Sequence, residues 1–174
     1  MVRAVVVSLL AVAVLGAGCD DDAAPGTTPD PGAIRAGLAA LYAGDHATAQ
    51  DRRDGACFAG QLVVRATPRQ LRDAGVLDAT WRVVPELPVL PEPLAELWVD
   101  AQFACVDFVE QSARAQEQVS HGTVDQEVYA ACLRDLVSPD RLHAAVVETL
   151  TGAWDGPEVT LLSRAQATCA GRAG

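Results

Sequence analysis

From residue 30 onward, this chain four times places a helix-capping residue directly before a proline: Asp30-Pro31, Thr67-Pro68, Ser138-Pro139 and Gly156-Pro157. Asp, Thr, Ser and Gly are accepted at a helix N-cap, and proline suits the first helical position because an N–H has no intrahelical partner there. Glycines that are suited to end helices follow at positions 44, 75 and 152. We therefore predict an all-α fold, a compact bundle of about six or seven helices.

Apolar residues recur at helical spacing over most of the chain. The strongest such stretch runs from Pro93 to Phe108, with an apolar side chain at every third or fourth position. Similar stretches cover residues 124–132, 142–150 and 162–169. Capping-box pairs add two predicted helix starts: Thr67 with Gln70, and Thr123 with Gln126.

One segment interrupts the helical pattern. Residues 81–93 carry a proline every two or three positions from Pro85 onward, which favours an extended or polyproline II course. Two interpretations are open: a strap that packs across the helices, or a strip that binds a partner. The apolar side chains of that strip would be Trp81, Val83, Leu87 and Val89.

Four cysteines in this region follow a weak internal repeat, and we expect them on buried helix faces. Cys57 is followed by a cap-proline start 11 residues later and Cys132 by one 7 residues later, and each unit ends in a further cysteine. The repeat predicts two similar helical units and the pairs Cys57–Cys105 and Cys132–Cys169. The competing pattern joins Cys105 to Cys132 and Cys57 to Cys169, and sequence alone does not choose between the two.

The first residues have the layout of an export signal. Arg3 precedes an apolar stretch from Ala4 to Ala17, which has the length of a secretory signal and is shorter than the ~20 residues needed to cross a bilayer. The stretch ends in Ala17-Gly18-Cys19, which resembles the bacterial lipobox, although Gly16 stands where that motif most often has leucine. The resemblance implies that Cys19 carries a diacylglycerol group and becomes the new N-terminus.

Cysteine parity agrees with this interpretation. The chain has five cysteines, and lipid on Cys19 would leave an even set for two disulfides in an oxidising compartment. Residues 20–30 are rich in Asp, Pro, Gly and Thr and have no large apolar side chain, which is typical of a flexible tether. We thus expect a signal peptide over 1–18, a lipid-anchored tether over 19–30, and a disulfide-stabilised helical domain over 31–174.

The chain carries a formal net charge of −10, with 13 basic and 23 acidic side chains. This balance disfavours nucleic acid as a partner, because binding to phosphates needs clustered positive charge. Beyond the lipobox, the Ala-Cys-Val-Asp stretch at 104–107, the Cys132 to Leu136 stretch and a late Cys169 resemble small exported helical proteins of actinobacteria. That resemblance implies helices and disulfides and transfers no functional residue.

Known catalytic motifs do not occur in the chain: it has no Gly-x-Ser-x-Gly elbow, no His-Glu-x-x-His and no Cys-x-x-Cys. His46, His121 and His143 lack the spacing of metal ligands, so we expect neither a metal nor a cofactor. The sequence favours a lipid-anchored protein on the extracytoplasmic face of the cell membrane that binds a protein or another envelope component. The alternatives are a small envelope hydrolase with a carboxylate or histidine cleft, in which Asp107 or His143 would act, and a passive spacer.

Overall fold

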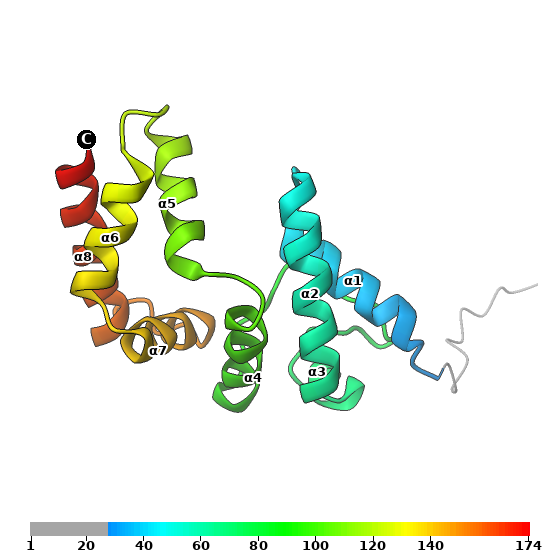
Figure 1. The fold of residues 1–174 in the computed structure, drawn as a ribbon. Helices are drawn as coiled ribbons and strands as arrows, with labels where there is room; N and C mark the ends of the chain where they lie inside the picture. The colour runs from blue at the N-terminus through cyan, green and yellow to red at the C-terminus, as the bar shows by residue number, and fades with distance from the viewer. Residues whose placement is uncertain (1–27) are drawn as a thin grey trace, which may run out of the picture.

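The computed structural model describes residues 28–174, and the chain is helical over most of them (Figure 1). The helices are α1 (Pro31–Ala43), α2 (Ala49–Arg65), α3 (Pro68–Asp73), α4 (Glu92–Phe103), α5 (Phe108–Val119), α6 (Gln126–Leu136), α7 (Pro139–Leu150) and α8 (Pro157–Ala173). The predicted all-α class is confirmed, with eight helices in this range rather than six or seven. The predicted signal peptide, Cys19 and most of the predicted tether lie outside the described residues.

The local start signals work as their chemistry predicts, with one exception. Each of the four cap-proline pairs begins a helix, and Thr67 forms the expected capping box with Gln70. The box predicted at Thr123 is wrong: Asp125 caps α6 instead, and its carboxylate accepts a hydrogen bond from the Val128 N–H. Aspartate is a stronger N-cap than threonine, so α6 begins after Asp125 rather than after Thr123.

The long periodic stretch from Pro93 to Phe108 is not one helix. Helix α4 ends at Phe103, and α5 begins only after Asp107. The Asp107 carboxylate accepts hydrogen bonds from the N–H groups of Val109 and Glu110. The prediction of a continuous helix is corrected because this aspartate satisfies two orphan donors at a new helix start. The break leaves an irregular linker, residues 104–107.

The helices form two groups, each with its own apolar core. Figure 1 places α1, α2 and α3 on one side of α4, and α5, α6 and α8 on the other. The first core includes Phe58, Leu62 and Trp98, and the second includes Tyr129, Leu133 and Cys169. Helix α7 joins the two groups, because its Val147 belongs to the first core and its Leu142 to the second.

The proline-rich segment is a strap. Trp81, Val83 and Leu87 pack against the first core, Leu90 is buried in it, and the Leu90 N–H donates to the carbonyl of Leu150 in α7. Val83 lies so close to α1 that a Cβ on Gly37 would come within 2.7 Å of its side chain. The strap thus covers the first core and ties it to α7.

The disulfides are Cys57–Cys105 and Cys132–Cys169, the pairing that the internal repeat predicts. The first joins α2 to the linker after α4, and the second joins α6 to α8, so each bridge stays within one helical group. The expectation that all four cysteines lie on buried helix faces is wrong for this first bridge. Cys57 is exposed, because α1 and α4 cover other faces of α2, and Cys105 lies in the linker rather than in a helix.

No helix within residues 28–174 combines the length and the apolar character that crossing a membrane requires.

The contact between α1 and α2 depends on a glycine. A Cβ on Gly55 would stand 2.5 Å from the carbonyl oxygen of Ala39, which is backbone and cannot swing away. Replacing Gly55 with alanine is expected to lower the free energy of unfolding by about 1–3 kcal/mol, because the two helices must separate. Chemical denaturation measures the effect.

Gly171→Ala is the matched control, because Gly171 lies in α8 with open space where its Cβ would be. There the same substitution should stabilise the protein by about 0.5–1 kcal/mol through the better helix propensity of alanine. A stabilising effect at both positions would show that the α1–α2 contact is not tight.

Candidate functional site

An open cavity lies where the two helical groups meet, between the linker after α4, the end of α6 and the start of α7. It has a volume of about 660 Å³ and is mostly apolar. It is lined by Phe103, Ala104, Cys105, Val106, Asp107, Val109, Arg134, Val137, Pro139 and Leu142. A volume of this size is typical of small-molecule sites, which are apolar clefts with a few polar groups at fixed places.

The polar groups of this cavity are fixed by ion pairs between α5 and α6. Arg134 lies in the last turn of α6, and its Nη2 is 3.1 Å from Asp107 Oδ2 and 2.5 Å from Glu110 Oε1. All three side chains are about half exposed, so the pairs contribute little stability. Their effect is geometric, because they hold the guanidinium in one position beside the apolar lining.

These contacts also determine the protonation states of Asp107 and Arg134. Partial burial favours the neutral form of Asp107, but the Glu110 N–H and the Arg134 guanidinium outweigh it, and the pKa of Asp107 is lowered. The pKa of Arg134 is raised by its bonds to Glu110 and Asp107. Asp107 is therefore ionised near neutral pH and offers no proton to a ligand in the cavity.

Asp107→Asn tests this assignment, because asparagine also caps helices but carries no charge. A lowered pKa in the folded state contributes stability above the unfolded pKa, and this contribution is lost as the pH falls through the folded pKa. At pH 6 the variant should therefore be less stable than the parent, by under about 1 kcal/mol because the pair is half exposed. The difference should shrink as the pH falls from about 4 towards 2, as measured by urea unfolding. If the difference in unfolding free energy between variant and parent stayed constant with pH, the Asp107 charge would not contribute to stability.

His143 was the other residue expected in a catalytic cleft, and it stands beside the cavity rather than in its lining. Its Nε2 lies 3.2 Å from Asp100 Oδ1, its Nδ1 lies 3.8 Å from Glu96 Oε2, and its ring packs edge-on against Phe103. Glu96 and Asp100 belong to α4, so the histidine links α4 to α7. The carboxylates orient the ring towards α4, and Phe103, which the ring contacts, lines the cavity.

The remaining histidines lie elsewhere. His46 and His121 are exposed, and His121 occupies a turn with a φ of 54°. Within residues 28–174 no group of three His, Cys, Asp or Glu side chains could hold a metal ion.

The four residues of the predicted partner-binding strip have different environments. Trp81, Val83 and Leu87 are half-buried against the first core, and the Arg72 guanidinium covers the Trp81 ring at 4.6 Å. Val89 is 58% exposed and lies beside Gly152 in the turn after α7. Trp154, in the same turn region, is 69% exposed. The apolar surface offered to solvent is therefore smaller than the sequence predicts.

Neither the cavity nor the role of Arg134 is predicted by the sequence. A local signal for the linker was present, because Asp107 and Glu110 have the spacing of a helix cap and its third residue. Arg134 carried no such signal, since it reaches Asp107 only through the packing of α5 against α6.

Comparisons with family models, with curated proteins and with solved structures find no match to this chain. Its function is therefore argued from its own residues.

Proposed function

We propose that this protein is a lipid-anchored binding module on the extracytoplasmic face of the cell membrane. The apolar cavity beside Arg134 is the observation that supports binding best, because its size and lining suit a small apolar or amphiphilic component of the envelope. The lipobox resemblance at Cys19 supports the anchor, and two disulfides support an oxidising compartment.

Binding is favoured over hydrolysis by the chemistry of the cavity. A general acid needs a raised pKa, and the pKa of Asp107 is lowered by its partners. His143 faces carboxylates of α4 and does not line the cavity. The cavity thus combines a permanent ion-pair cluster with apolar walls, which can hold and orient a ligand.

A neutral fluorescent probe, N-phenyl-1-naphthylamine, tests the site directly. The parent protein should bind it saturably, and lipids extracted from the producing cells should displace it. Ala104→Trp should weaken probe binding at least about tenfold, because Ala104 lines the cavity and a large indole placed there would take up part of its volume.

Ala115→Trp is the control, since Ala115 is an exposed residue of α5 that does not line the cavity. It should bind the probe like the parent. Equal binding by both variants would place the probe elsewhere and contradict the proposed site, and so would the absence of saturable binding to the parent.

A further inference from the structure

The two disulfides differ in their access to solvent. Cys132 is 8% exposed and Cys169 is fully buried in the second core. Cys57 is exposed on the surface of α2, and Cys105 is half-buried in the wall of the cavity. An external thiol can therefore reach the first bridge in the folded protein, whereas the second must be uncovered by local unfolding.

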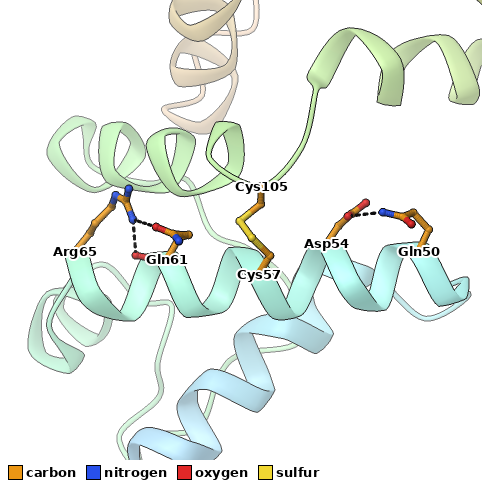
Figure 2. The surroundings of a disulfide bond; sticks show 6 residues. All are labelled: Gln50, Asp54, Cys57, Gln61, Arg65 and Cys105. Atoms are coloured by element: carbon orange, nitrogen blue, oxygen red, sulfur yellow. Dashed lines mark hydrogen bonds between the residues drawn. A yellow bond between two sulfur atoms is a disulfide. The ribbon is translucent and has the colours of Figure 1, made fainter.

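The surroundings of the first bridge leave it open. Figure 2 shows Asp54 one turn before Cys57 on α2 and Gln61 one turn after it. Asp54 accepts a hydrogen bond of 2.7 Å from the side chain of Gln50, and Gln61 accepts from Arg65. Both polar pairs bond along α2 rather than across the disulfide.

The second sulfur of this bridge belongs to the linker between α4 and α5, among charges of both signs. Cys105 lies two residues before the cap of α5, near the positive end of that helix dipole, but it also directly follows Ala104, the C-cap at the negative end of α4. Arg134 shares the cavity wall with Cys105 and is already paired with Asp107 and Glu110. The direction of attack therefore rests on the exposure of Cys57 rather than on a charge beside Cys105.

We propose that Cys57–Cys105 is a thiol-exchange site whose substrate class is a small or protein-borne thiol of the envelope. The thiolate of that substrate attacks Cys57 Sγ, a mixed disulfide forms between the two, and the bond to Cys105 Sγ breaks with its electron pair left on Cys105. Cys105 takes a proton from water. The thiolate of a second thiol then attacks the substrate sulfur of the mixed disulfide, and the bond to Cys57 Sγ breaks with its electron pair left on Cys57, which takes a proton. Two thiols are thereby oxidised to one disulfide, and the bridge is reduced by two electrons.

Exchange at this bridge also acts on the cavity. The bridge ties the 104–107 linker to α2, and all four residues of this linker line the cavity. Opening the bridge frees this wall while the second core keeps its own disulfide. Thiol exchange at Cys57–Cys105 depends on the exposure of the two bridges and not on the ligand proposed for the cavity.

Excess reduced glutathione provides the test, with the full-length oxidised protein in its native state. Samples are quenched over time with an alkylating reagent, and peptide masses report each bridge separately. Cys57–Cys105 should open at least about tenfold faster than Cys132–Cys169. The intermediate should carry glutathione on Cys57 and a free thiol on Cys105.

Concentrated urea gives the control, because unfolding removes the protection of the second bridge and the two rates should become comparable. Equal rates in the native protein, or faster opening of Cys132–Cys169, would overturn the proposal. Glutathione found on Cys105 rather than Cys57 would overturn the assigned direction of attack.

Discussion

Phe58→Ala is expected to lower the free energy of unfolding by about 3–5 kcal/mol, which is a large part of the stability of a domain of this size. Phe58 is fully buried in the first core, where its ring centroid lies 4.5 Å from that of Tyr42 and 4.7 Å from that of Trp98. Truncation removes both aromatic contacts and leaves a cavity between α1, α2 and α4. Urea unfolding of the oxidised protein, followed by circular dichroism, gives the value.

Val64→Ala is the matched control, because Val64 lies on the same helix and is 78% exposed. Its effect should stay within about 0.5 kcal/mol. A loss at Phe58 below about 1 kcal/mol would mean that α2 does not pack on α1 and α4 as described.

Removal of the buried disulfide, by Cys132→Ala together with Cys169→Ala, is expected to cost about 4 kcal/mol from loop closure alone. The two cysteines are 37 residues apart, so the bridge restricts a long segment of the unfolded chain. Their burial in the second core adds the cost of a cavity, about 1–2 kcal/mol. Chemical denaturation of the double variant measures the sum.

The comparison variant is Cys57→Ala together with Cys105→Ala. Its bridge spans a similar 48 residues, so the loop-closure effect is nearly shared, while Cys57 is exposed and leaves no cavity. The variant that lacks Cys132 and Cys169 should therefore be less stable than the variant that lacks Cys57 and Cys105. The reverse order would contradict the difference in burial on which the thiol-exchange proposal rests.

Helix starts and the all-α fold class could be predicted from the sequence because their signals are local. Cap-proline pairs act within one turn, and all four begin a helix in the structure. The sequence left two disulfide pairings open, and the structure has the one in which each bridge closes one unit of the repeat. The strap interpretation follows from prolines that cannot continue a helix.

Features that depend on packing could not be predicted in the same way. The apolar period continued through residues 104–107 although the helix did not, because a capping aspartate overrides periodicity locally. The exposure of Cys57 depends on which faces of α2 are covered by α1 and α4, and this is a property of the assembled core. The cavity and its ion pairs join residues that lie 24 and 27 positions apart in sequence.

The proposed lipid anchor and the two disulfides can be tested together by the intact mass of the protein. The protein is extracted from the membranes of the cells that produce it and measured with and without reductant. We predict the mass of residues 19–174 plus a lipid group, because the proposed lipidation would make Cys19 the anchored N-terminus. Reduction should add about 4 Da, two hydrogens for each bridge. A lipid-free mass would contradict the anchor, and a mass that reductant leaves unchanged would contradict the disulfide-stabilised fold in its native compartment.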